Sequence, residues 1–475
     1  MKINETIAAV STPYGRGGIA VIRISGERAA EIADKVFIPK SGKALSSHAD
    51  RSAIYGDILC DGRVTDDGIA VIYRAPRSYT GEDTVEISCH GGILLTEKVL
   101  SSVFEAGAVP ASAGEFTRRA FVNGRIELSR AEAVIGLIDA ESESQIKLFA
   151  SHSSGVLGRR IDSYCAALRS LLSSVYVCID YPDEDLEELG RDELAARLSS
   201  LLAELEATRD TYREGKAVSL GVDTVILGKP NAGKSSLLNR LLGEERAIVT
   251  DIAGTTRDTI EEKLTLGRIM LRLCDTAGIR QTEDEIERIG VLRALERAHG
   301  AELIFAVFDG SCELDREDRE LALLSLRLLS EGKNVVFIIN KADMPQKFGF
   351  SELFSLAFGS ESAPPEYADR IKSVSVSARS GDGIHALKSA VESLFVSGNI
   401  DYSNVAVIAS ARQHAAVSAA ADAVKRAQSA LSLGFGTDVC GLDMEQALSL
   451  LGEIDGRTVS EQITDEIFHR FCVGK

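Results

Sequence analysis

The residues with the clearest chemical meaning form the sequence Gly228-Lys229-Pro230-Asn231-Ala232-Gly233-Lys234-Ser235, which fits the phosphate-binding pattern G-x-x-x-x-G-K-[ST]. The apolar run at 225–227 predicts a strand before this loop, and residues 236–242 predict a helix after it. Backbone N–H groups at the start of that helix would then face phosphate oxygens. Lys234 supplies a charge to the outer phosphates, and the Ser235 hydroxyl can bind Mg²⁺. An ordinary glycine turn would not require lysine and serine at these offsets.

Three further segments follow in the order that a guanine-nucleotide domain requires. Asp275-Thr276-Ala277-Gly278 comes after a strand-like run, so the Asp275 carboxylate would hold Mg²⁺ through water and the Gly278 N–H would sense the γ-phosphate. Asn340-Lys341-Ala342-Asp343 and Ser377-Ala378-Arg379 also follow strand-like runs. Asp343 can accept hydrogen bonds from N1–H and N2–H₂ of guanine, which adenine lacks, and a backbone N–H of the 377–379 segment would reach guanine O6. The set predicts a GTP site.

The residue that orients the attacking water is not obvious from the sequence. Ras-like enzymes carry glutamine directly after the Asp-x-x-Gly segment, whereas this chain has Ile279. The candidates lie in the acidic segment 283–288, which includes Glu287. The same charges also suit a solvated helix start, where the helix dipole favours acidic residues.

The loop at 250–258 offers a way to neutralise charge in the transition state. Its carbonyl oxygens, with the side-chain oxygen of Asn231, would surround a monovalent cation beside the phosphates, and Thr256 would remain for Mg²⁺. Asn231 alone could equally stiffen the phosphate loop. The residues expected to bind GTP are Asn231, Ala232, Gly233, Lys234, Ser235, Ser236, Thr250, Asp251, Ile252, Ala253, Gly254, Thr255, Thr256, Asp275, Thr276, Ala277, Gly278, Asn340, Lys341, Ala342, Asp343, Ser377, Ala378 and Arg379.

Length and composition limit the remaining possibilities. The 475 residues suffice for about three domains. A net charge of −18 disfavours a protein that coats nucleic acid through bulk electrostatics. The sequence has no apolar stretch of membrane-spanning length and no signal-peptide pattern at its start, so we expect a soluble, cytoplasmic protein that does not bind membranes. The eight cysteines form no C-x-x-C pair, which fits reduced thiols rather than a zinc site.

Changes in hydrophobic pattern divide the chain into four segments. Residues 1–122 mix strand and helix patterns and predict an α+β domain, and 221–396 alternate strands and helices and predict an inserted, doubly wound P-loop domain. The helical patterns of residues 123–220 and 397–475 predict two halves of one all-α domain. Within these halves we expect an amphipathic helix with Asp192 as its N-cap and another helix over 405–433.

The whole chain resembles the MnmE (TrmE) family of tRNA modification GTPases. The resemblance rests on the GTPase segments together with the C-terminal Cys472-Val473-Gly474-Lys475 and on residues 12–18, 23–26, 79–83, 90–92, 114–117, 120–124 and 180–184. It implies that Glu287 is the catalytic glutamate. It also implies that the K⁺ ligands are Asn231, Thr250, Ile252 and Thr255, while Ser235 and Thr256 stay the Mg²⁺ ligands expected from the phosphate loop and the 250–258 loop.

The resemblance further implies a homodimer formed through the N-terminal domain, which binds a folate one-carbon donor, 5-formyl- or methylene-tetrahydrofolate. The matching folate positions are Arg23, Glu82, Arg125 and Lys475, where Arg125 replaces the lysine expected in the family. With an FAD-containing MnmG-type partner, in a heterotetramer or a larger complex, such a protein modifies carbon 5 of the wobble uridine of tRNA. Cys472 is a candidate nucleophile for carbon 6, or a packing residue.

Two other function classes stay open at the sequence level. The first is a regulatory or ribosome-assembly switch GTPase without a chemical role. Residues 397–475 carry six Lys and Arg against ten acidic residues, so they form no basic RNA-binding tail. The second is an ATP-dependent enzyme, which would require that Asp343 is not the base-reading residue.

Overall fold

The computed structural model describes residues 5–180, 190–245, 262–273, 298–396, 402, 404–435 and 437–475. The chain forms two compact units, one made of Met1–Ile135 with Leu448–Lys475 and the other of Gly136–Ala447. In the described parts of the chain, no helix combines the length and the apolar character needed to cross a membrane.

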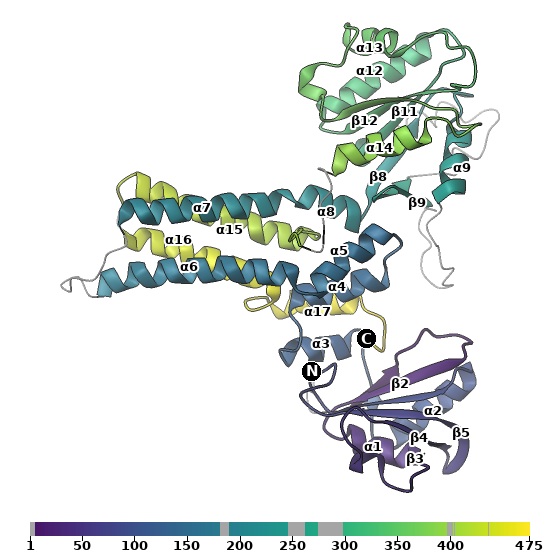
Figure 1. Cartoon of the computed structure of the whole chain (residues 1–475), viewed down its shortest axis with the longest axis vertical. Helices are drawn as coiled ribbons and strands as arrows, with labels where there is room; N and C mark the ends of the chain where they lie inside the picture. The colour runs from purple at the N-terminus through teal and green to yellow at the C-terminus, as the bar shows by residue number, and fades with distance from the viewer. Residues whose placement is uncertain are drawn as a thin grey trace. The chain divides into compact units, whose positions relative to one another are not determined.

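The first unit is built on a seven-stranded sheet with the order β3-β4-β5-β6-β2-β1-β7 (Figure 1). Neighbouring strands are antiparallel except for the β1–β7 pair. The strands are β1 (Ile7–Val10), β2 (Ile19–Ser25), β3 (Phe37–Pro39), β4 (Ala53–Cys60), β5 (Arg63–Tyr73), β6 (Thr84–His90) and β7 (Val109–Pro110). The helices that lie wholly in this unit are α1 (Ala29–Val36), α2 (Ile93–Glu105), α3 (Glu115–Val122) and α17 (Glu461–His469), with a 3₁₀ turn η1 (Leu45–Ser47).

One face of this sheet forms the core of the unit. Ile22 and Ile24 of β2 and Ile87 of β6 are buried with Ile32 of α1 and Val99 of α2 in one hydrophobic cluster. Because successive side chains of a strand point to opposite faces, the alternate residues of these strands lie on the other face of the sheet. The prediction of an α+β domain is therefore confirmed, and the predicted strands at 19–24, 69–73 and 84–87 lie in β2, β5 and β6.

The second unit contains a six-stranded sheet with the order β13-β12-β11-β8-β10-β9, parallel except for β9. Its strands are β8 (Val222–Leu227), β9 (Glu262–Leu266), β10 (Ile269–Leu273), β11 (Leu303–Asp309), β12 (Asn334–Asn340) and β13 (Ile371–Ser375). Helices cover both faces, α9 (Lys234–Glu245) and α14 (Ile384–Phe395) with one hydrophobic cluster and α12 (Arg316–Ser330) and α13 (Phe350–Phe358) with the other. A short 3₁₀ turn, η2 (Pro365–Tyr367), precedes β13. The predicted doubly wound fold is confirmed.

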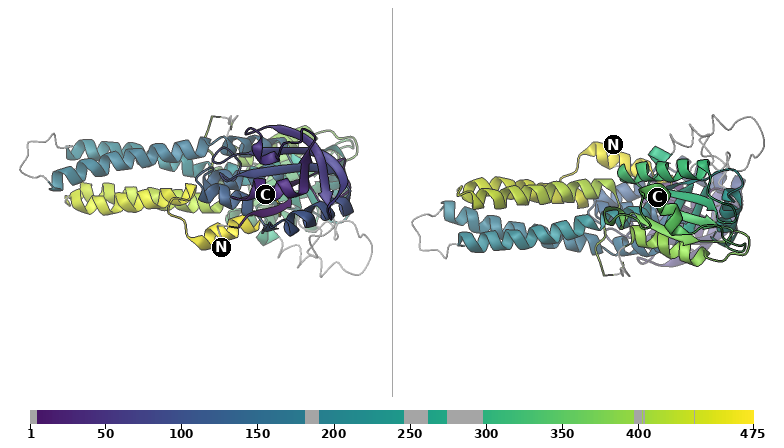
Figure 2. Two further views of the ribbon diagram at one scale, coloured as in Figure 1. Left: turned by 90° about the horizontal axis from the view of Figure 1, so that it is seen from below. Right: turned by 90° about the horizontal axis from the view of Figure 1, so that it is seen from above.

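Long helices from before and after this sheet pack side by side (Figures 1 and 2). Gln428 of α15 donates a 2.7 Å hydrogen bond to the Ser199 hydroxyl of α7, and Tyr164 of α6 bonds Thr208 of α7. The helices are α5 (Glu143–Ser153), α6 (Val156–Asp180), α7 (Arg191–Asp210), α8 (Tyr212–Ser219) and α15 (Ala411–Ser432), while α4 (Leu128–Ile138) and α16 (Thr437–Asp455) span the unit boundaries. The all-α prediction holds for these segments.

Two predicted helix boundaries are wrong. The N-cap of α7 is Gly190, so Asp192 lies in the first turn, where its charge still suits the helix dipole. The helix predicted over 405–433 begins only at Ala411, because Ser410 and Gln413 form a capping box there. Just before it, the Ile408 N–H donates to the Thr211 hydroxyl at 3.0 Å, which holds the chain outside the helix.

Candidate nucleotide site

The phosphate loop has the predicted strand–loop–helix context. Strand β8 ends at Leu227, and α9 begins at Lys234. A Cβ at Gly228 would lie 2.5 Å from the Val307 carbonyl oxygen, and one at Gly233, where φ is +90°, would lie 2.1 Å from Asn340 Nδ2. Larger residues at these glycines would therefore displace β11 or the Asn340 side chain.

Lys234 and the two serines stand at the start of α9. Lys234 Nζ donates to the carbonyl oxygens of Gly228 and Lys229 at 2.7 and 2.9 Å, so its charge lies inside the loop. Burial lowers the pKa of Lys234. Ser235 and Ser236 occupy the first turn of the helix. A helix start with an enclosed lysine provides the donors and the positive charge that bind phosphate groups.

Asn340 joins the phosphate loop to both predicted base-recognition segments. Its Nδ2 donates to the Ala232 carbonyl at 2.9 Å, and its Oδ1 accepts from the Ala378 N–H at 3.1 Å. The side chain is 1% exposed, so neither bond competes with bulk water. The structure therefore brings together three sequence segments that were predicted to share one site.

Asp343 lies at the open side of this cluster. The Ser377 hydroxyl donates to its Oδ1 at 2.6 Å, and this bond lowers the pKa of Asp343. Arg240 of α9 donates to the carbonyl oxygens of Ala378 and Arg379, which fixes the segment from which a backbone N–H would reach the base. An ionised carboxylate beside a fixed backbone segment can accept from N1–H and N2–H₂ of guanine.

The sequence reading missed Asp309, which ends β11 next to this cluster. Its Oδ2 accepts from Lys341 Nζ at 2.6 Å, and its Oδ1 accepts from the N–H and hydroxyl of Ser311. Lys341 has a positive φ of +62°, so its backbone and its side chain are both constrained. The only signal in the sequence was an acidic residue at the carboxyl end of a strand in the same sheet.

Several predicted residues lie outside the described part of the chain. They are Thr250, Asp251, Ile252, Ala253, Gly254, Thr255, Thr256, Asp275, Thr276, Ala277, Gly278, Ile279 and Glu287. Among the predicted metal ligands, the structure describes Asn231 and Ser235. Asn231 is exposed in the phosphate loop with a φ of +61°.

The four predicted folate residues belong to the first unit. Arg23 bonds Glu86 at 2.8 Å, and its guanidinium lies 5.2 and 5.5 Å from the ring centroids of Tyr79 and Phe116. Arg23 Nη1 also donates to the Gly474 carbonyl at 3.4 Å, one residue before Lys475. Arg23 is thereby tied to the C-terminal tail.

Glu82 and Arg125 lie at a neighbouring turn. Both Glu82 oxygens accept from Arg119, and one also accepts from the Ser25 hydroxyl at 2.8 Å. A Cβ at Gly81 would be 3.1 Å from Arg125 Cγ, so the arginine stem packs against this turn. The sequence reading missed Arg119, a buried cation that pairs with both Glu82 and Glu115.

The C-terminal tail is docked on the sheet of the same unit. Val473 forms a β-bridge with Ala113, and the Ser11 hydroxyl donates to the Gly474 carbonyl at 3.0 Å. Gly474 has a φ of +103°, and a Cβ there would lie 2.0 Å from the Val10 carbonyl oxygen. Cys472 is exposed on this tail.

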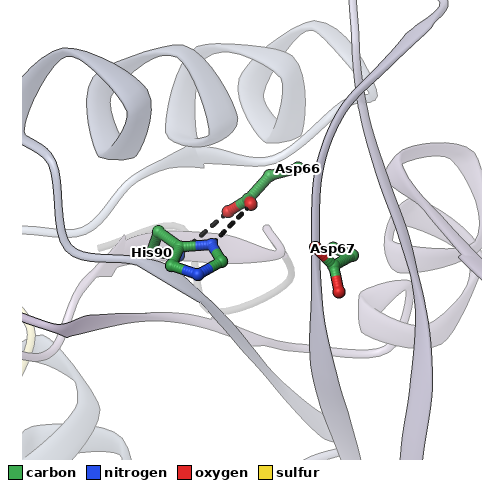
Figure 3. A group of neighbouring side chains, drawn as sticks. All are labelled: Asp66, Asp67 and His90. Atoms are coloured by element: carbon green, nitrogen blue, oxygen red, sulfur yellow. Dashed lines mark hydrogen bonds and ion pairs between the residues drawn. The ribbon is translucent and has the colours of Figure 1, made fainter.

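Asp66, Asp67 and His90 form another group of titratable side chains in the first unit (Figure 3). Asp66 accepts from the His90 ring at 2.7 Å and from the His90 N–H at 2.9 Å. Burial raises the pKa of Asp66, but the hydrogen bonds from His90 and from the Asp67 N–H together lower it by more, and the Asp66 bond raises the pKa of His90. Since both Asp66 oxygens are used by His90, the group acts as an ion pair on the sheet and we assign it no metal.

Comparisons with known proteins match the whole chain. The family model described as "MnmE helical domain" matches residues 128–472, and "GTP-binding protein TrmE N-terminus" matches residues 6–125. Three curated relatives carry the name tRNA modification GTPase MnmE. The protein of Clostridioides difficile (strain 630) is 39% identical over 100% of both chains. Those of Listeria welshimeri and Geobacillus thermodenitrificans (strain NG80-2) are each 40% identical over 99% of both chains.

Proposed function

Because the chain belongs to the MnmE family of tRNA modification GTPases, we propose that it hydrolyses GTP in a K⁺-dependent manner to modify carbon 5 of the tRNA wobble uridine. The chain is a GTP hydrolase acting in tRNA modification. The observation that carries the GTP part is the Asn340 side chain, which holds the phosphate loop and the base-recognition segment together.

The described residues have distinct roles in this proposal. The first turn of α9 and Lys234 bind the outer phosphates, and the Ser235 hydroxyl in that turn is suited to Mg²⁺, which would balance phosphate charge. Asp343 selects guanine, and Ser377 orients its carboxylate. Asn231 is exposed on the loop, which fits a role as a K⁺ ligand together with Thr250, Ile252 and Thr255. Thr256 as a second Mg²⁺ ligand and Glu287 as the water-positioning residue complete the proposed site.

The folate donor would bind the first unit, at Arg23, Glu82, Arg125 and Lys475. Arg23 lies beside the rings of Tyr79 and Phe116, and its guanidinium could pair with a carboxylate of an anionic ligand. Arg23 and Glu82 already bond Glu86 and Arg119, so they are held in place by neighbours rather than free in solvent. We include Arg125 because its stem packs against Gly81, the residue before Glu82.

We further propose a homodimer through residues 1–122, with an MnmG-type FAD protein and tRNA as partners of the full assembly. The sheet face that points away from the core of this unit is consistent with such a dimer. Tyr55 and Ile69 lie directly opposite each other on it and are 54% and 46% exposed, and exposed apolar side chains can take part in an interface. We also propose that the helical halves 123–220 and 397–475 form one domain, into which the GTPase domain 221–396 is inserted.

A nucleotide and folate experiment tests the proposal. We expect GTP hydrolysis that is faster in KCl than in NaCl, hydrolysis of ATP that is far slower, and binding of 5-formyltetrahydrofolate measured by titration calorimetry. Lys234→Ala is expected to abolish tight GTP binding and leave folate binding unchanged. GTP hydrolysis without folate binding would instead favour a switch GTPase, and wild-type affinity in Lys234→Ala would reject the phosphate site.

A further inference from the structure

Lys229 makes an ion-paired contact that its place in the phosphate pattern does not predict. Its Nζ lies 2.8 Å from Asp315 Oδ2 and 2.7 Å from Asp318 Oδ2. The Lys229 side chain is 13% exposed and that of Asp318 is 2% exposed, so this pair is largely shielded from water, whereas the Asp315 side chain is 51% exposed. Shielded charge pairs are stronger than surface pairs, and removal of one partner leaves the other charge uncompensated.

The two carboxylates begin helix α12 as a reciprocal capping box. Asp315 Oδ1 accepts from the Asp318 N–H at 3.0 Å, and Asp318 Oδ2 accepts from the Asp315 N–H at 3.1 Å. The hydrogen bond from Lys229 lowers the pKa of Asp315 to about 2, so that carboxylate is ionised at neutral pH. Two neighbouring carboxylates repel each other, and Lys229 is the cation that compensates them.

The same lysine belongs to the loop that surrounds Lys234. The Lys229 carbonyl accepts from Lys234 Nζ at 2.9 Å, and Pro230 restricts the backbone of the residue before it. The Lys229 side chain is anchored on α12 while its carbonyl positions Lys234. The contact of Lys229 with the start of α12 therefore helps to position Lys234, the residue proposed to bind the phosphates.

We propose that Lys229 is a positioning residue that screens the phosphate site from the acidic start of α12. Asp315 and Asp318 would otherwise present negative charge beside a loop that must accept a triphosphate. This inference rests on the proposed function, because it assumes that nucleotide phosphates bind at 228–235. It predicts that the nucleotide affinity contributed by Lys229 increases with the phosphate charge of the ligand and decreases as salt screens that charge.

The test compares affinities for GTP and GDP in wild type, Lys229→Met, Lys229→Arg and Lys229→Met/Asp315→Asn, at constant K⁺ and two ionic strengths. We expect Lys229→Met to weaken GTP roughly tenfold or more, the scale for loss of a charged hydrogen bond, and to weaken GDP less. The defect becomes smaller at high ionic strength. Lys229→Arg retains most of the affinity, and Asp315→Asn restores much of it in the double variant.

The single variant Asp315→Asn gives an independent test, because its GTP affinity is expected to rise where that of Lys229→Met falls. If Lys229 screens the site, removal of one carboxylate tightens GTP, whereas a purely structural contact would weaken GTP. Equal loss of GTP and GDP affinity, with no salt dependence and no rescue, would overturn the inference. Wild-type affinity in Lys229→Met would also overturn it. Failure of the wild-type protein to bind GTP would instead reject the proposed function.

Discussion

The Ser377 hydroxyl donates a 2.6 Å hydrogen bond to Oδ1 of Asp343, across the 34 residues that separate them in sequence. This bond and a backbone hydrogen bond lower the pKa of Asp343, so the carboxylate is an ionised acceptor at neutral pH. A single serine thus orients the side chain that we propose distinguishes guanine from adenine.

The first prediction concerns base selection. Asp343→Asn replaces two acceptor oxygens with one acceptor and one donor, so GTP binds more weakly and xanthosine triphosphate binds relatively better. Ser377→Ala keeps the carboxylate but removes its hydrogen bond, and we expect a loss of GTP affinity of roughly threefold to tenfold. Competition binding with GTP, ATP and xanthosine triphosphate measures both. An unchanged base preference in Asp343→Asn would contradict the assignment.

The sequence predicted the strand–loop–helix context of the phosphate loop correctly, because one local motif carries that information. The strand before the phosphate loop and the helix after it are local, and the structure begins α9 at Lys234 of the motif itself. The contact of Lys229 with Asp315 joins residues 86 positions apart, so no local sequence pattern predicts it. The N-cap at Gly190 was missed because glycine makes no side-chain cap, whereas the neighbouring Asp192 fits the usual signal.

The second prediction concerns the monovalent cation. If Asn231 and loop carbonyls bind K⁺, KCl accelerates GTP turnover and NaCl does not, because a site sized for K⁺ holds the smaller Na⁺ poorly. Asn231→Lys would put an ammonium group at the site and make the rate independent of the cation. Turnover is measured at matched ionic strength. Equal rates in the two salts for the wild-type protein would argue against the K⁺ site.

The third prediction concerns the C-terminal tail. Gly474→Ala forces a Cβ to within 2.0 Å of the Val10 carbonyl at a φ of +103°, so the tail must shift away from Arg23. We expect the Kd for 5-formyltetrahydrofolate to rise roughly tenfold, on the scale of 1–3 kcal/mol for such backbone strain. Val473→Ala is the matched control, because Val473 is 60% exposed. Equal folate affinity in both variants would separate the tail from folate binding.

The fourth prediction concerns pH and the Asp66–His90 pair. The lowered pKa of Asp66 gives stability that is present above about pH 4 and lost as pH falls through the folded-state pKa. The raised pKa of His90 gives stability that is complete below about pH 6.5 and lost as pH rises through the folded-state pKa. His90→Ala therefore lowers Tm more at pH 5.5 than at pH 9.

Thermal unfolding followed by circular dichroism measures the difference between wild type and His90→Ala at the two pH values. His385→Ala, at an exposed histidine of α14, serves as the control. A Tm loss in His90→Ala that is equal at both pH values would show that the ring contributes packing and not charge.

The last prediction concerns Glu287, which lies outside the described residues and is assigned from the sequence and the family. Ile279 occupies the position where Ras-like enzymes carry glutamine, and an apolar side chain cannot orient the attacking water. We expect Glu287→Ala to lower turnover by roughly 10²-fold or more, the usual scale for positioned proton-transfer groups, with little change in GTP affinity. Glu283→Ala and Glu285→Ala are matched controls from the same acidic segment and are expected to change turnover far less. If the three variants lose activity equally, the segment acts through its net charge. If Glu287→Ala keeps most of its turnover in K⁺, another group positions the water.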